Sequence, residues 1–171
     1  MSIVVLGDDV YVSGYETATS GTKIWKNGAR ISIENITGPI VNALCASGND
    51  LYATGTKTAG NSDIWYWKNE TGVQLTEALA TRAITVSGST VYVAGQNTSF
   101  QAVYWKNESI VVLDESETPG GSEAKSIFVS GENVYAVGKK GLDIVYWKNS
   151  VLVKISANAD SRNNGMGIAF K

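Results

Sequence analysis

Histidine is absent from the 171 residues, and cysteine occurs only once, as Cys45. The lack of histidine removes the commonest general base and a preferred metal ligand, and with them serine–histidine, cysteine–histidine and most zinc chemistries. A single cysteine excludes an intramolecular disulfide, so redox chemistry gives no information on the compartment. We therefore expect no cofactor and no bound metal.

Long apolar runs and an excess of charge of one sign are also lacking. Lys and Arg number 14 against 16 Asp and Glu, and the basic residues are scattered along the chain, so binding to nucleic acid through bulk charge is not expected. No apolar stretch approaches the roughly 18 residues of a membrane span, and the chain does not open on a basic leader with an apolar segment. As given, the sequence predicts a soluble polypeptide of unknown compartment, and export with a removed leader stays open.

Proline is scarce, at two residues, whereas glycine occurs 18 times and valine, isoleucine, threonine, tyrosine and tryptophan are abundant. This composition favours strands and turns over helices.

Two markers recur four times each. Trp-Lys-Asn stands at 25–27, 67–69, 105–107 and 147–149, and Gly-x-x-Val/Leu-Tyr begins at Gly7, Gly48, Gly88 and Gly131. The sequence therefore predicts four copies of one unit of about 40 residues, each with four short strands.

Lengths inside the unit separate two kinds of connection. The interval from the glycine after the first strand to the glycine ending the second is seven residues in all four units, as from Gly7 to Gly14. The interval from the tryptophan to the apolar residue ending the fourth strand is always eight, as from Trp25 to Ile33. The two remaining connections vary in length, and a meander places them together on the opposite edge of the sheet. Variable loops on a rigid frame are the usual place for recognition.

The second and third strands are apolar on both faces, as in Ala102-Val103-Tyr104-Trp105, so both faces must be covered. We therefore predict an all-β fold, a β-propeller with four four-stranded blades in a single domain over 1–171, with the repeated tryptophans packed between blades. A surplus strand is expected at 167–170. Three arrangements stay open: a four-bladed ring, half of an eight-bladed ring closed by a homodimer, or a piece of a longer gene.

The segments Val-Ser-Gly-Glu-Asn-Val-Tyr-Ala-Val-Gly (129–138) and Val-Tyr-Trp-Lys-Asn (145–149) resemble the repeats of uncharacterised bacterial β-propeller-like proteins. The resemblance covers all four repeats. It implies a propeller fold and, for many members of that family, export or a lipid anchor. It supplies no catalytic or binding residues to carry over.

The candidate binding residues lie in or beside the connections of variable length. They are Asn42, Ser62, Asp63, Ser99, Gln101, Glu123, Asp143 and Asn163. Our first hypothesis is a non-enzymatic binding or scaffold module that meets a protein or glycan partner through this edge. The alternatives are a glycoside hydrolase that uses loop carboxylates and a propeller fragment that assembles with itself.

Overall fold

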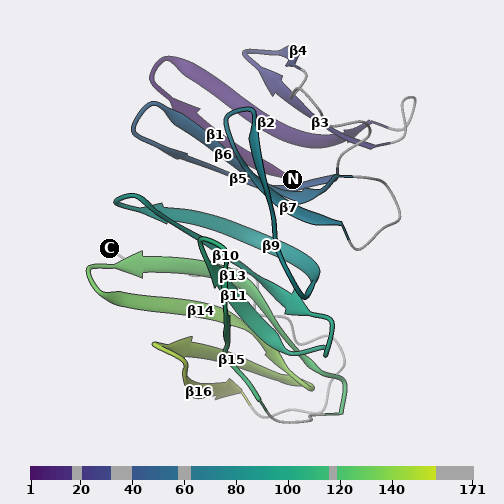
Figure 1. Cartoon of the computed structure of the whole chain (residues 1–171), viewed down its shortest axis with the longest axis vertical. Helices are drawn as coiled ribbons and strands as arrows, with labels where there is room; N and C mark the ends of the chain where they lie inside the picture. Colours follow the sequence, from purple (N-terminus) through teal and green to yellow (C-terminus); the bar gives the residue numbers. More distant parts are fainter. Residues whose placement is uncertain (17–20, 32–39, 58–62, 116–118, 157–171) are drawn as a thin grey trace.

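The computed structural model describes residues 1–16, 21–31, 40–57, 63–115 and 119–156, which form sixteen β-strands and no helix. The strands make four separate antiparallel sheets of four strands, and each sheet consists of consecutive strands in meander order (Figure 1). The prediction of an all-β chain with four four-stranded units is confirmed. The surplus strand expected at 167–170 lies outside the described residues. In the described part of the chain, no helix has the length and apolar character of a membrane crossing.

The sheets are numbered here in chain order. The first sheet contains β1 (Ser2–Leu6), β2 (Asp9–Glu16), β3 (Gly21–Lys26) and β4 (Ala29–Ile31). The second contains β5 (Ile40–Ser47), β6 (Asp50–Thr56), β7 (Ile64–Lys68) and β8 (Thr71–Gln74). The third contains β9 (Ala78–Ser87), β10 (Thr90–Asn97), β11 (Ala102–Lys106) and β12 (Ser109–Val112). The fourth contains β13 (Ser122–Ser130), β14 (Asn133–Lys140), β15 (Asp143–Lys148) and β16 (Val151–Ser156).

The asparagine of each Trp-Lys-Asn motif joins the two tight turns of its sheet. In the first sheet, the backbone N–H of Asn27 donates to the carbonyl of Val10 at 2.9 Å, and its side-chain Oδ1 accepts from the N–H of Val10 at 2.8 Å. Asn27 has a φ of 50°, a left-handed conformation that asparagine tolerates better than most residues. The same reciprocal pair is made by Asn69 with Leu51, Asn107 with Val91, and Asn149 with Val134. This clip explains why both turns have fixed length.

The lysine of the motif covers the same edge of the sheet. Lys26 Nζ lies 2.7 Å from Asp9 Oδ2 and 5.6 Å from the centre of the Tyr11 ring. Lys68 repeats this arrangement with Asp50 at 2.8 Å and with Tyr52. The same aspartates accept from the turn asparagines, Asp9 from Asn27 Nδ2 at 2.7 Å and Asp50 from Asn69 Nδ2 at 2.8 Å, so each holds both a lysine and an asparagine.

In the second, third and fourth sheets, the tryptophan of the motif packs its sheet on the sheet before it in the chain. Trp67 joins Tyr11 and Ile24 of the first sheet in one apolar cluster. Trp105 joins residues of the second sheet, and Trp147 joins residues of the third. These three side chains are at most 2% exposed, which confirms the predicted packing role. Trp25 is only half-buried, because no described sheet precedes the first.

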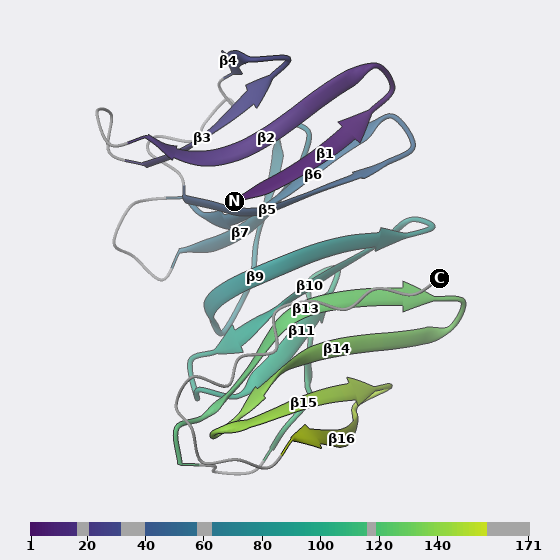
Figure 2. The ribbon, with the colours of Figure 1, turned by 180° about the vertical axis from the view of Figure 1, so that it is seen from behind.

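The first strands of the sheets follow one another through the molecule: β1 contacts β5, β5 contacts β9, and β9 contacts β13. Each sheet thereby packs on the next in chain order, and the first and fourth sheets lie at opposite ends (Figures 1 and 2). The core consists of three apolar clusters, one between each pair of consecutive sheets.

Candidate binding site at the variable-loop edge

A β-bulge occurs at the same register in three of the four first strands. Asn42 of β5 lies between two paired residues, Val41 and Ala43, and has no partner of its own on β6. Arg82 of β9 and Lys125 of β13 are skipped in the same way. Because a bulge bends the strand and redirects a side chain, bulges are common beside functional sites. The three bulges lie where the variable connections enter the sheets.

Glycine on the second strand makes each bulge possible. A Cβ placed on these glycines would lie within 2.0 Å of a carbonyl oxygen of the bulged strand, a distance that no side chain can occupy. The three pairs are Gly55 with Ile40, Gly95 with Ala80, and Gly138 with Glu123. In the first sheet, β1 pairs with β2 only as far as Ser13, and the corresponding Gly14 meets the Trp25 ring instead, at 3.1 Å. The repeated glycine is therefore explained by close backbone approach in three sheets.

Polar contacts link the bulges across three sheets. The side-chain amide of Asn42 donates to the carbonyl oxygen of Thr81 on β9 at 2.9 Å. The guanidinium of Arg82 donates from Nε to Oε1 of Glu123 on β13, and Lys125 Nζ lies 2.5 Å from the other oxygen of Glu123. We call Asn42, Arg82, Lys125 and Glu123 the bulge row.

Charge in the bulge row is set by one enclosed carboxylate and two cations. Glu123 is 5% exposed. Burial by itself raises the pKa of this carboxyl, but the hydrogen bonds and charges of Lys125 and Arg82 outweigh that effect and hold the pKa below its ordinary value. Glu123 is therefore ionised at neutral pH, and the bulge row has a formal net charge of one positive unit. Arg82, with 41% of its side chain exposed, presents that charge at the surface.

A loop of the third sheet is fastened to the bulge row. Asn97 Oδ1 accepts from the backbone N–H groups of Ser99 at 3.1 Å and Gln101 at 2.9 Å, and its amide donates to Gln101 Oε1. Gln96 Nε2 then donates to the carbonyl of Ser122 at 2.8 Å, next to Glu123. The structure thus brings four predicted residues, Asn42, Ser99, Gln101 and Glu123, to connected parts of one edge.

Two predicted aspartates are held within their own sheets. Asp63 Oδ1 accepts from Trp65 Nε1 at 2.6 Å and from Gln74 Nε2 at 3.0 Å in the second sheet. Asp143, at the start of β15 in the fourth sheet, forms an ion pair with Lys154 at 2.7 Å. The contacts of both aspartates are thus local, and neither joins the bulge row. Ser62 and Asn163 lie outside the described residues.

The predicted set omitted two important residues, Arg82 and Lys125. Their signal is present in the sequence: each stands two positions before the buried apolar residue of its strand, Ile84 or Ile127, where Asn42 also stands relative to Leu44. Strict alternation would place each bulge residue on the same face of its strand as the buried apolar residue two positions later. Only the bulge turns the polar side chain away from that face.

A cleft at the opposite edge was also not predicted. It has a volume of about 570 Å³ and lies between the second and third sheets beside the fixed turns. Tyr52, Tyr66 and Lys68 contribute to its lining, and both tyrosines are at most 7% exposed. Since the aromatic rings are packed in the core, the cleft offers little aromatic surface to a ligand.

Comparison with known proteins gives a likeness of fold. No protein family and no curated protein matches the sequence. Among solved structures, the chain is similar to the crystal structure of the computationally designed Ika4 protein, with a TM-score of 0.50 and 16% sequence identity. The match covers 85% of this chain and 88% of that chain. At this identity the likeness concerns the fold alone.

Proposed function

We propose that the four sheets are blades of a β-propeller and that the protein is a binding module whose site is the bulge row. The contacts of β1 with β5, β5 with β9 and β9 with β13 support the propeller, because first strands that follow one another in this way line a central axis in that architecture. The bulge row then stands at the mouth of the axis, on the edge with variable loops. The observation that carries the proposal is the repetition of the bulge at one register in three sheets.

The ligand carries an acidic group, on a glycan or on a protein surface. Glu123 is shared between two cations, so its charge does not neutralise both Arg82 and Lys125. The fork of a guanidinium suits a carboxylate, and a half-exposed arginine beside a partly enclosed lysine can accept one from solvent. Asn42, Ser99 and Gln101 add neutral polar groups along the same edge, which suits a hydroxyl-rich or peptide partner.

The same contacts favour binding over glycoside hydrolysis. A glycosidase needs one carboxylic acid whose pKa is raised so that it can donate a proton. The pKa of Glu123 is lowered, and both its oxygens are occupied by Lys125 and Arg82. Glu123 therefore has the properties of a structural anion that orients two cations.

The experiment measures binding of the full chain to two printed arrays, one of acidic and neutral glycans and one of acidic peptides. We expect retention on acidic members of one array and a loss of about tenfold or more for Arg82→Gln, since a charge-assisted hydrogen bond contributes roughly 1.5–3 kcal/mol. Lys106→Gln is the matched control, because Lys106 is an exposed cation beside the fixed turns, and it should bind as the wild type does. Equal binding of the Arg82→Gln variant, or no preference for acidic members, would contradict the proposal.

A further inference from the structure

The first sheet exposes an apolar face that is buried in the other three sheets. Ile3 of β1 is 67% exposed, whereas the residues at the same repeat position, Leu44, Ile84 and Ile127, are 5%, 7% and 6% exposed. Val5, on the same face of β1, is 62% exposed. In the second, third and fourth sheets this face packs on the sheet that precedes it in the chain.

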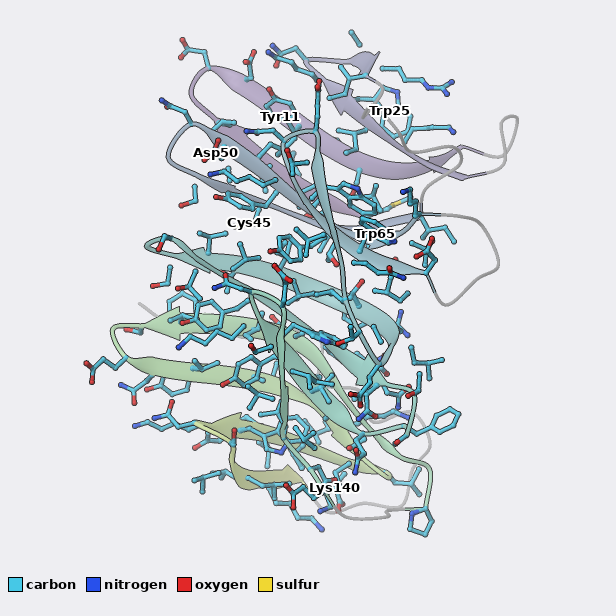
Figure 3. All side chains as sticks on the ribbon, in the orientation of Figure 1. Tyr11, Trp25, Cys45, Asp50, Trp65 and Lys140 are labelled. Carbon is cyan, nitrogen blue, oxygen red and sulfur yellow. The ribbon has the colours of Figure 1, made fainter. Side chains whose placement is uncertain are left out.

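Trp25 belongs to the same uncovered face. Its counterparts Trp67, Trp105 and Trp147 fill the gap to the preceding sheet, but Trp25 lines an open pocket of about 430 Å³ together with Ile3 and others. Figure 3 shows Trp25 at the end of the molecule formed by the first sheet, with Lys140 at the other end. In the other three sheets, the corresponding place is filled by side chains of the preceding sheet.

The fourth sheet exposes its other face, which in the second and third sheets packs on the sheet that follows in the chain. Ile155 of β16 is 57% exposed, whereas its counterparts Leu75 and Leu113 are 3% and 6% exposed, because each is covered by the sheet that follows. Tyr146 is half-buried, and its counterparts in the second and third sheets are buried. The fourth sheet therefore carries the face that a following sheet would cover.

The two faces match each other, because inside the chain they already pack together three times. Ile84 and Leu75 share one core cluster, and Ile127 and Leu113 share the next. The first and fourth sheets of one chain stand at opposite ends and do not cover each other (Figure 2). An apolar face that no described part of the chain covers marks an interaction site.

We infer that a second copy of this chain covers both faces. The fourth sheet of each copy docks on the first sheet of the other, so two identical head-to-tail interfaces close a ring of eight sheets. Trp105 Nε1 donates to the carbonyl of Thr76, the residue after Leu75, at 3.1 Å. Trp147 Nε1 makes no such bond, so the apolar packing of the indole is the contact that repeats, and it is the contact expected for Trp25 in the docked pair. The docking follows from the apolar faces, and only closure into a ring rests on the propeller proposed above.

Light scattering on the full chain after size exclusion tests the inference. We expect a single species of twice the chain mass of 18.2 kDa at micromolar concentration. Ile3→Asp and Ile155→Asp each place a charge in one of the docking faces, and each should raise the dissociation constant by about 100-fold or more, since central apolar contacts dominate interface energy. Phe100→Asp is the control, because Phe100 is 60% exposed but lies in a loop of the third sheet, and it should stay dimeric.

A monomeric wild type, an open series of larger species, or dimers that survive both face variants would overturn the inference. Hydrogen exchange on the wild type needs no variant: dilution should deprotect 2–6 and 151–156, and deprotection confined to other strands would contradict the docking. Arg82→Gln should leave the mass unchanged. A wild-type dimer that shows no preference for acidic array members, or an Arg82→Gln dimer that binds them as the wild type does, would therefore count against the proposed ligand site alone.

Discussion

Trp105→Ala measures how much one repeated tryptophan stabilises the fold. The side chain is completely buried between the second and third sheets, in a cluster with Tyr66 and Leu75. Its Nε1 also donates to the carbonyl of Thr76 at 3.1 Å. Removal of the indole thus leaves a cavity and an unpaired carbonyl.

The expected loss follows from those two contacts. Truncation of a buried tryptophan to alanine costs about 3 to 5 kcal/mol, and the lost hydrogen bond adds about 1 kcal/mol. We expect the free energy of unfolding to fall by about 4 to 6 kcal/mol, a large part of the roughly 5 to 15 kcal/mol that stabilise a typical domain. Trp25→Ala should cost much less, about 1 to 2 kcal/mol, because Trp25 is half-buried and none of the described sheets covers it.

Urea unfolding followed by circular dichroism gives both values, with each substitution made in the Ile3→Asp chain so that the docking of a second copy does not contribute. The decisive comparison is whether Trp105→Ala lowers the free energy of unfolding more than Trp25→Ala does. Equal losses for Trp105→Ala and Trp25→Ala, or a loss under about 1 kcal/mol for Trp105→Ala, would refute the packing argument.

Gly95→Ala should destabilise the chain by about 3 kcal/mol or prevent folding, because the added Cβ would lie 2.0 Å from the carbonyl oxygen of Ala80. Gly14→Ala should cost less, because its Cβ would come closest to a ring atom of Trp25, at 3.1 Å. Thermal melting of the two variants measures the difference. Glu123 has a pKa below its ordinary value of 4.5, so its ionised form stabilises the fold above that pH, and this contribution is lost as pH falls through the folded-state pKa. The stability difference between wild type and Glu123→Gln should thus shrink on acidification, and a difference that stays constant from pH 7 to pH 3 would contradict the ion-pair assignment.

The sheets could be predicted from sequence because the repeat fixes them several times over. Four equal intervals between glycines, and four between tryptophan and an apolar residue, require hairpins of one register. The half-buried state of Trp25 could not be predicted from its motif, which is identical to the other three. Its exposure depends on position in the row of sheets, a property of the whole molecule.

The candidate site was predicted in part. Asn42 and Glu123 were chosen because they lie near variable connections, and the structure places both in the bulge row. Arg82 and Lys125 were missed because a bulge changes the face on which a residue lies, and alternation rules assume an unbroken register. Asp63 and Asp143 were chosen for equivalent repeat positions, but they belong to the second and fourth sheets, so the third sheet lies between them.

The asparagine clips have a consequence for protein engineering. One edge of every sheet is closed by paired hydrogen bonds between its two turns, as between Asn107 and Val91, so an added residue there would break a bond on each side. Foreign peptides grafted for display would thus be tolerated only on the opposite edge, where natural lengths already differ. Because the clips recur in all four sheets, such grafts could be multiplied on a single chain without redesign of its rigid side.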